Sequence, residues 1–260
     1  MNNWNSTICQ TNNTIIHYTR TGGDKPPVIL LHGLMTSGLC WTDMARQLEN
    51  DYDVIMPDAR GHGQSGVPDF GYAYNDHADD VAGLIAALQI TKPVVIGHSM
   101  GGMITAVLAA RQPDLLKGVV LADPPFIPTK VQREVRDSDV ADQHRKVLLL
   151  SLAEVIADAK KRHPHRSAEN IEIFAQARLQ TSMAAFDILT PPYPDYKALI
   201  KKITIPALLV FGDKGVVTKA IAEEIPGIQV EEIPQAGHSL HMDQPERFAA
   251  IIRSFLHSLS

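Results

Sequence analysis

The sequence predicts an α/β fold in which a mostly parallel, twisted sheet is flanked by helices and carries a helical lid insertion. Short, almost wholly apolar runs alternate along the chain with segments whose apolar residues repeat at helical spacing. This alternation is typical of parallel sheets, because parallel strands need crossover helices and are buried on both faces. At 260 residues, the chain is long enough to bury the core that such a sheet requires.

Five apolar runs and one further segment near the end of the chain are expected to form the parallel strands. The five runs are short and rich in Val, Ile and Leu, as strands covered on both faces should be. The segment Ile15–Tyr18 precedes the first long crossover, and we expect it to form part of an antiparallel edge. The five runs are Val28–Leu31, Val54–Met56, Val94–Ile96, Val119–Leu121 and Ala207–Phe211, and the last strand is expected around Ile228–Ile233.

Helices are predicted where apolar residues recur at i, i+3, i+4 and i+7. This spacing occurs over residues 81–88, between the second and third strands. It occurs again over residues 248–255, near the end of the chain. Asp243 and Pro245 mark the start of this last helix.

A helical insertion is predicted between the fourth and fifth of these strands. The stretch from Val119 to Phe211 contains no glycine, and its first half is charged and helix-prone. Apolar stripes predict one helix over residues 148–159 and a second one after Ser167. A segment of this length must bury its apolar faces, and the rim of the sheet is available. We therefore predict a core domain of residues 1–125 and 199–260 and a helical cap, or lid, of residues 126–198.

Composition argues against several classes of function. The formal net charge of −5 gives no basic footprint for nucleic acid or an anionic membrane. The first residues lack the basic and apolar regions of a signal peptide, and no apolar run approaches the roughly 20 residues that span a bilayer. We therefore expect a cytoplasmic protein. No metal-ligand spacing occurs, and we expect neither a metal nor a cofactor.

The most informative motif is Gly97-His98-Ser99-Met100-Gly101, which predicts a nucleophile elbow. It follows an apolar strand and precedes a stretch of small residues typical of a helix. A sharp turn between strand and helix strains the serine backbone and lifts its hydroxyl clear of the sheet, and only glycine tolerates the crowding on either side. In this context the pattern indicates a nucleophilic serine.

Polar residues also follow other strands, at the edge where open parallel sheets bind their ligands. Ser99, Asp123 and His238 each follow a predicted strand. A serine hydroxyl needs a base to become nucleophilic, and histidine titrates near neutral pH. A carboxylate then orients the imidazole and stabilises its charged form. We therefore expect catalysis by Ser99, with His238 as the base and a carboxylate behind it.

Two backbone N–H groups are expected to stabilise the oxyanion that forms when serine attacks a carbonyl. One belongs to Met100, which follows Ser99 at the N-terminus of the helix. The other belongs to the turn at Gly33 and Leu34, which follows the first strand. A proline at position 34 would remove that N–H.

These motifs closely resemble the α/β-hydrolase family, and the resemblance spans nearly the whole chain. The order of serine, acid and histidine along the chain is the family's order. The resemblance implies the α/β-hydrolase fold and a serine hydrolase that needs no cofactor. The motifs are His32-Gly33 with Ser37, Asp58-Ala59-Arg60-Gly61-His62-Gly63-Gln64-Ser65, Gly97-His98-Ser99-Met100-Gly101-Gly102 and Gly237-His238.

The sequence departs from the usual family pattern at the acid. Most members carry G-x-x-D after the next-to-last strand, where this chain has Gly212-Asp213-Lys214-Gly215. The expected aspartate is therefore replaced by Gly215. Asp123 follows the strand Val119–Leu121, which corresponds to the sixth core strand of the family, and this position is used by a minority that includes haloalkane dehalogenases and zearalenone-type lactonases. The resemblance favours Asp123 as the triad acid and leaves Asp213 as the alternative.

Other titratable residues near these motifs have structural interpretations. Asp58 and Arg60 share one loop and are expected to tie that turn together. His98 is expected to point from the elbow into packing. His241 lacks the Gly-His pattern and is expected to lie where the chain approaches its last helix.

The sequence therefore predicts a serine hydrolase that cleaves a carboxylic ester or lactone through an acyl-enzyme. Gly33, Trp41 and Phe126 are assigned to its substrate pocket, although Trp41 fits equally well as a core residue. The alternatives are a C–C bond or amide hydrolase of the same fold and a hydrolase-like signalling receptor. The expected partner is a small-molecule substrate, not nucleic acid or a membrane. The substrate's identity and a homodimer through the lid helices are left open.

Overall fold

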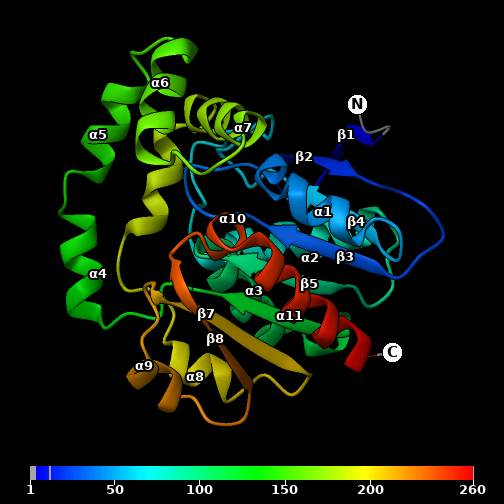
Figure 1. Ribbon diagram of the computed structural model, residues 1–260. Helices are drawn as coiled ribbons and strands as arrows, with labels where there is room; N and C mark the ends of the chain where they lie inside the picture. The colour runs from blue at the N-terminus through cyan, green and yellow to red at the C-terminus, as the bar shows by residue number, and fades with distance from the viewer. Residues whose placement is uncertain (1–3, 12, 260) are drawn as a thin grey trace.

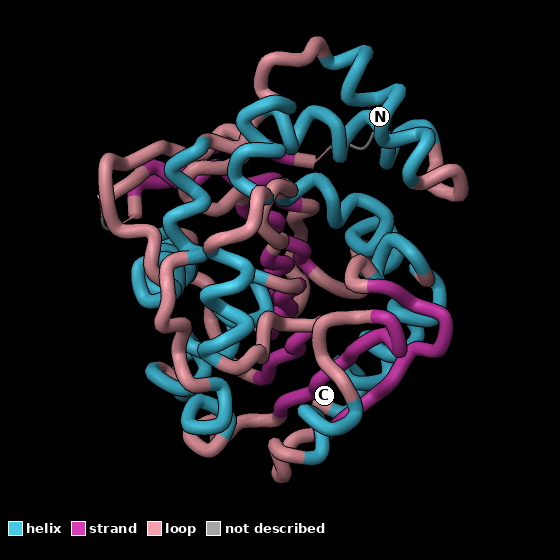
Figure 2. The backbone as a smooth tube through the Cα atoms, turned by 90° about the vertical axis from the view of Figure 1, so that its left-hand side faces the viewer, coloured by secondary structure: helices cyan, strands magenta, loops and turns pink. Residues whose placement is uncertain are grey.

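The computed structural model describes residues 4–11 and 13–259 and contains one eight-stranded sheet with helices on both sides (Figure 1; Figure 2). The strand order is β1-β2-β4-β3-β5-β6-β7-β8. Strands β3 to β8 pair in parallel, which confirms the predicted α/β architecture. The strands are β1 (Asn5–Gln10), β2 (Ile15–Arg20), β3 (Pro27–Leu31), β4 (Asp53–Pro57), β5 (Val94–His98), β6 (Gly118–Ala122), β7 (Ala207–Lys214) and β8 (Gln229–Gly237).

The helices connect these strands and fill the long segment between β6 and β7. Three short 3-10 helices complete the described elements: η1 (Gly38–Trp41), η2 (Pro113–Leu115) and η3 (Met183–Leu189). The α-helices are α1 (Thr42–Leu48), α2 (Tyr74–Ala87), α3 (Met100–Arg111), α4 (Thr129–Arg136), α5 (Val140–Val147), α6 (Leu152–Arg162), α7 (Ala168–Leu179), α8 (Tyr196–Ile200), α9 (Lys219–Glu223), α10 (Leu240–Asp243) and α11 (Pro245–Ser258).

The antiparallel edge contains one strand more than the sequence indicates. The predicted segment lies in β2, which pairs antiparallel with both β1 and β4. Strand β1 was not predicted, because five of its six residues are exposed and its polar sequence carries no apolar run. Its backbone pairing with β2, over the full length of both strands, holds it in the sheet.

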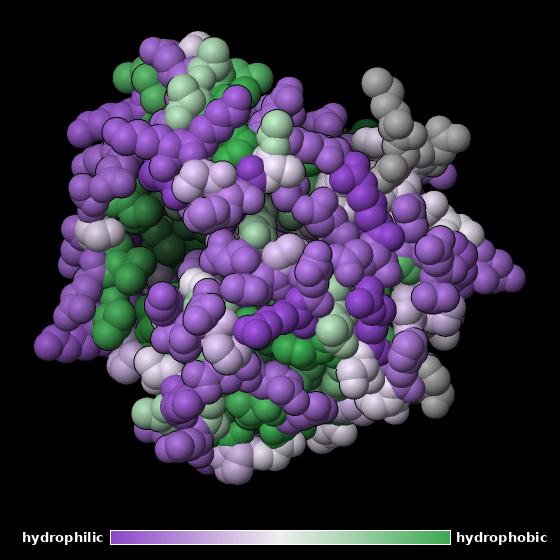
Figure 3. Space-filling model, viewed as in Figure 1, coloured by the Kyte–Doolittle hydropathy of each residue, from purple (hydrophilic) through white to green (hydrophobic). Residues whose placement is uncertain are grey.

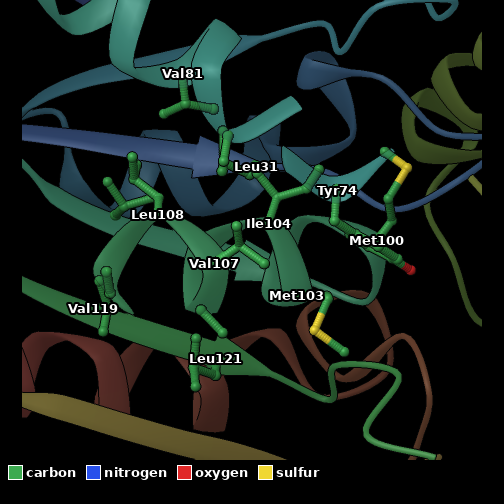
Figure 4. Packing of buried hydrophobic residues seen from close by; sticks show 14 of the residues in the cluster. Leu31, Tyr74, Val81, Met100, Met103, Ile104, Val107, Leu108, Val119 and Leu121 are labelled. Carbon is green, nitrogen blue, oxygen red and sulfur yellow. The ribbon is translucent and has the colours of Figure 1, made fainter. Parts of the chain in front are cut away.

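The two faces of the sheet bury two separate apolar clusters. Val28 and Leu30 of β3 pack with α1 and α11, whereas Ile29 and Leu31 pack with α2 and α3. Alternate side chains of a strand point to opposite faces, so a strand that is apolar throughout fills both clusters. Figure 4 shows part of the second cluster, in which Leu31 lies near Ile104 of α3. This packing makes the sheet a rigid platform for the turns at its rim.

The inserted segment differs from the prediction in one helix. The expected helix over residues 148–159 begins four residues later than predicted, since α6 starts at Leu152 and residues 148–151 separate it from α5, which ends at Val147. Ser151 forms a capping box: its Oγ accepts from the Glu154 N–H, and the Glu154 carboxylate accepts from the Ser151 N–H. This local hydrogen bonding favours a new helix start over continuation of the preceding helix.

Helices α4 to α7 lie beyond the ends toward which the parallel strands point (Figure 1). Polar contacts join α7 to the core: Arg46 of α1 pairs with Glu169 at 2.7 Å, and the Asn170 amide donates to Asp43 at 2.7 Å. Helix α8 crosses the predicted boundary at 198/199 and contributes Ile200 to the core. The division into core and cap stays a prediction.

Two properties of the described residues bear on the classes of function considered above. None of the helices there is both long and apolar enough to cross a membrane. The same residues include no cluster of three or more His, Cys, Asp or Glu side chains suited to a metal ion.

Candidate active site

Ser99 lies at the turn between β5 and α3 with φ of +53° and ψ of −118°. This is a strained conformation for a residue with a side chain. The turn is tight enough that a Cβ at Gly97 would lie 2.1 Å from the Gly101 carbonyl oxygen. A Cβ at Gly101 would lie 2.4 Å from the carbonyl oxygen of Leu31. Both positions therefore require glycine, for the reason that the sequence suggests.

His238 joins Ser99 to Asp123 by hydrogen bonds. Its Nε2 lies 2.9 Å from Ser99 Oγ, and its Nδ1 lies 2.6 Å from Asp123 Oδ2. The three residues follow β5, β6 and β8 and so come from separate parts of the chain. With Nδ1–H donated to the carboxylate, Nε2 is left to accept the proton of the Ser99 hydroxyl.

The Asp123 carboxylate is fully buried and is held by the loop after β7. The backbone N–H of Val216 donates to Oδ2 at 2.8 Å, and that of Val217 donates to Oδ1 at 2.8 Å. A buried carboxylate is costly unless such donors satisfy its oxygens. These two N–H groups and His238 therefore make a charged Asp123 compatible with its burial.

Asp213, the alternative acid, is exposed at the end of β7. The family position for the acid is Gly215, and a Cβ there would lie 2.6 Å from Asp123 Oδ2. The Asp123 carboxylate thus occupies the space that a side chain at position 215 would need. The structure brings Asp123, and not Asp213, to His238.

The expected oxyanion donors flank Ser99. A Cβ at Gly33 would lie 3.2 Å from the Ser99 Cβ, so the turn after β3 packs directly against the elbow. Met100 is the first residue of α3. Among the described residues, the N–H groups of Leu34 and Met100 donate no hydrogen bond. Both donors remain available at the N-terminal end of a helix, where the helix dipole favours negative charge.

The family can be assigned from the chain itself. A family model described as the alpha/beta hydrolase fold matches residues 26–245, which include the elbow, both aspartates and His238. The chain belongs to the α/β-hydrolase family. The sequence departs from the pattern of most family members in one respect, because its expected acid follows β6.

Relatives and solved structures agree with the assignment to the α/β-hydrolases. The 2-(acetamidomethylene)succinate hydrolase of Mesorhizobium japonicum is 28% identical over 260 residues, covering 91% of this chain and 90% of the relative. The pimeloyl-[acyl-carrier protein] methyl ester esterase of Chromobacterium violaceum is 28% identical over 255 residues, covering 92% and 97%. A crystal structure of E-2-(acetamidomethylene)succinate hydrolase superposes with a TM-score of 0.84 at 26% identity, covering 98% and 99%. The protein is a hydrolase.

Two cavities of this α/β-hydrolase meet at Ser99. The smaller one, about 270 Å³, has a polar wall that includes Arg162 and Arg178, and Gly33 also lines it. The larger one, about 500 Å³, is lined mainly by apolar side chains, among them Val131 of α4. Figure 3 shows a hollow with hydrophobic walls beside α4. The Ser99 hydroxyl therefore faces one compartment with charged side chains in its wall and one that is mainly apolar.

Trp41 and Phe126 differ from their expected place in the substrate pocket. Both are fully buried, and neither lines the two cavities at Ser99. Trp41 stacks on His241 with ring centroids 4.1 Å apart, and Phe126 stacks on Tyr196 at 4.9 Å. Large aromatic rings gain more from complete burial in the core than from a place at a solvated rim.

The loop after β4 forms its own hydrogen-bonded unit. Asp58 accepts from the Gly38 N–H at 2.8 Å and lies 2.8 Å from His17 Nδ1. Arg60 pairs with Asp80 at 2.6 Å. The side chains of both pairs, Asp58 with His17 and Arg60 with Asp80, are buried. This arrangement agrees with the structural interpretation of Asp58 and Arg60.

Histidines other than His238 are buried around the site. His98 Nε2 donates to the carbonyl oxygen of His238 at 2.8 Å and so helps to hold the backbone of His238 in place. Burial, together with the neighbouring histidines, holds the pKa of His98 well below its usual range. Burial lowers the pKa of His241 and of His62 to about 3 each. These rings are therefore neutral at physiological pH.

We expect these histidines to make the fold sensitive to acid. The unfolded chain binds their protons with a pKa of 6.5, whereas the folded chain binds those of His62 and His241 only near pH 3. Their stabilising contribution is therefore complete above pH 6.5 and is lost as the pH falls toward 3. Each should lower the free energy of unfolding by about 2 kcal/mol at pH 5 relative to pH 7.

Urea unfolding at pH 7 and pH 5 measures this difference. In a His241→Leu variant the loss between the two pH values should be about 2 kcal/mol smaller than in the parent protein. His257 is exposed on α11, and a His257→Leu variant should show the full loss. Equal stability of the parent protein at both pH values would contradict the prediction.

Sequence reasoning missed three contributors to the site. The N–H groups of Val216 and Val217 are backbone donors, which no residue pattern reveals. Arg178 lies four residues after Phe174 on α7, so both side chains share one helix face and both line the smaller cavity. That shared face was visible in the sequence as a basic residue on an apolar stripe.

Proposed function

We propose that the protein is a serine hydrolase that cleaves a carboxylic ester or lactone through an acyl-enzyme. The observation that carries this proposal is the continuous hydrogen-bonded chain from Asp123 through His238 to Ser99, at the junction of two cavities. Such a chain supplies a nucleophile, its base and the group that orients the base.

In the first half of the reaction, Ser99 Oγ attacks the carbonyl carbon of the substrate, and its proton passes to His238 Nε2. The carbonyl oxygen becomes an oxyanion, which the N–H groups of Leu34 and Met100 stabilise. Asp123 stabilises the imidazolium through Nδ1–H. When the tetrahedral intermediate collapses, the C–O bond to the alcohol breaks, and the alkoxide takes the proton from Nε2.

In the second half, a water molecule hydrolyses the acyl-enzyme. His238 Nε2 accepts one proton of the water as its oxygen attacks the acyl carbon, and the bond to Ser99 Oγ then breaks with return of that proton to the serine. The His238 side chain is 40% exposed, which leaves a path for this water. The products are a carboxylic acid and an alcohol, joined in one molecule when the substrate is a lactone.

The same residues could also hydrolyse other kinds of bond, and the names of the related proteins include esters and amides among the substrates. The Chromobacterium relative is named as a methyl ester esterase, which supports the ester proposal. The Mesorhizobium relative is named for a substrate with an acetamido group, which makes an amide the alternative. Hydrolysis of a C–C bond and a receptor that turns over slowly are further alternatives.

Steady-state hydrolysis of matched esters, lactones and amides tests the proposal. We expect multiple turnovers of a short-chain chromogenic ester and stoichiometric labelling by a fluorophosphonate. Turnover of amides without turnover of the corresponding esters would replace the proposal by the amide alternative. A single turnover with a tightly held product would favour a receptor.

A further inference from the structure

Arg178 carries a positive charge without an anionic partner at the candidate site. It lines the smaller cavity together with Ser99, Leu34 and His238. Its Nε is buried and has no hydrogen-bond partner among the described residues. Within the same residues, no carboxylate lies within ion-pair distance of its guanidinium. An unpaired, partly desolvated guanidinium is costly and needs a ligand to satisfy it.

Unlike Arg178, two neighbouring arginines each have a carboxylate partner. Arg166 lies 5.6 Å from the centroid of the Phe174 ring and pairs with Asp243 at 3.1 Å. Arg162 also lines the smaller cavity, but it pairs with Asp158 one helical turn earlier. Arg178 lies 5.9 Å from the centroid of the same Phe174 ring and has no such pair. Of the three, only Arg178 therefore presents an uncompensated charge to the cavity.

The groups around Arg178 do not neutralise it. Burial lowers the pKa of Arg178, and the charge of Arg162 lowers it further, while Asp158 acts in the opposite direction. The His144 ring is neutral in this environment, because burial lowers the pKa of His144 as well. The local field at this wall of the cavity is therefore positive.

We propose that the substrate of this site carries a carboxylate besides the bond that is cleaved, and that Arg178 binds this carboxylate. The inference rests on the proposed function and narrows its substrate class. The apolar remainder of the substrate would occupy the larger cavity, whose walls are mainly aliphatic and aromatic. The planar fork of a guanidinium matches a carboxylate in shape and can hold both of its oxygens.

The test compares esters that differ only in this charge. The monomethyl esters of succinate, glutarate and adipate carry a free carboxylate on the acyl side. Methyl esters of monocarboxylic acids with the same chain lengths lack it. Acetate esters of ω-hydroxy acids place the carboxylate on the alcohol side. We expect a higher kcat/KM for the charged member of at least one series.

Substitution of Arg178 should remove this preference. In an Arg178→Met variant, the ratio of kcat/KM for the charged ester to that for the neutral ester should fall by about 10- to 100-fold. Arg178→Lys should restore part of the ratio, since it keeps the charge without the fork. Arg166→Met is the matched control, because it removes the arginine that lies beside the same ring but outside the cavity lining. In this variant the ratio of kcat/KM for the charged ester to that for the neutral ester should equal the ratio in the parent protein.

A binding measurement separates this inference from the proposed function. Calorimetric titration of a Ser99→Ala variant with succinate and glutarate should give binding that the additional Arg178→Met change abolishes. Inorganic phosphate is the second probe, and tighter binding of phosphate than of either dicarboxylate would overturn the carboxylate proposal. Neutral and charged esters cleaved with equal kcat/KM would also overturn it, while leaving the proposed function intact. Failure to cleave any ester, with dicarboxylates still bound through Arg178, would overturn the proposed function alone.

Discussion

Replacing Ser99 by alanine is expected to lower kcat for ester hydrolysis by about 10⁵- to 10⁶-fold. The variant keeps the oxyanion donors and both cavities, but no oxygen remains at the elbow to attack the carbonyl. The residual rate should be that of water attacking a bound substrate. Alanine has no greater need for space than serine, so the fold should be retained at the strained turn.

The measurement combines kinetics with covalent labelling. A fluorophosphonate should label the parent protein once, and the Ser99→Ala variant should remain unlabelled. Ser254 is exposed on α11, and a Ser254→Ala variant should label like the parent protein. Persistent labelling of the Ser99→Ala variant would mean that another side chain is the nucleophile, and peptide mapping would identify it.

Asparagine at position 123 is expected to lower kcat by about 10⁴-fold. The amide cannot stabilise the imidazolium, and its NH₂ group can favour the wrong tautomer of His238. It would also turn one acceptor oxygen into a donor facing the N–H of Val216 or Val217. A loss of stability is therefore expected beside the loss of turnover.

Asp213→Asn is the matched control for this prediction. Asp213 is exposed and lies outside the hydrogen-bonded chain, so its substitution should change kcat by no more than a few-fold. Urea unfolding of both variants separates damage to the fold from damage to catalysis. A large loss of turnover in Asp213→Asn with little effect in Asp123→Asn would reverse the assignment of the acid.

Most of the fold could be read from local patterns. The apolar runs located β3 to β7, because a strand buried on both faces leaves few polar positions. The elbow could be read as well, because only glycine fits on either side of its serine. Strand β1 escaped prediction, since an exposed edge strand is held by backbone pairing rather than by apolar side chains.

Other differences arose where a local signal was ambiguous. The apolar stripe that begins at Leu148 continues past Ser151 in the sequence, yet the capping box at Ser151 starts a new helix. From the sequence alone, Trp41 fits a place in the core as well as it fits a place in the substrate pocket. Its stacking on His241 depends on a residue two hundred positions away, which no window of sequence can supply.

The sequence by itself determined the class of fold and the family and predicted the serine and histidine of the candidate site, because each of these depends on residues adjacent in the chain or on the order of strand ends. Only the tertiary structure decided which aspartate lies against His238. The two aspartates follow β6 and β7, which are far apart in the chain but neighbours in the sheet, and the space at Gly215 is filled by the carboxylate of Asp123. The tertiary structure also decided that Arg178 faces the cavity of Ser99, since the orientation of an inserted helix depends on how it docks to residues of the core that lie far away in the chain.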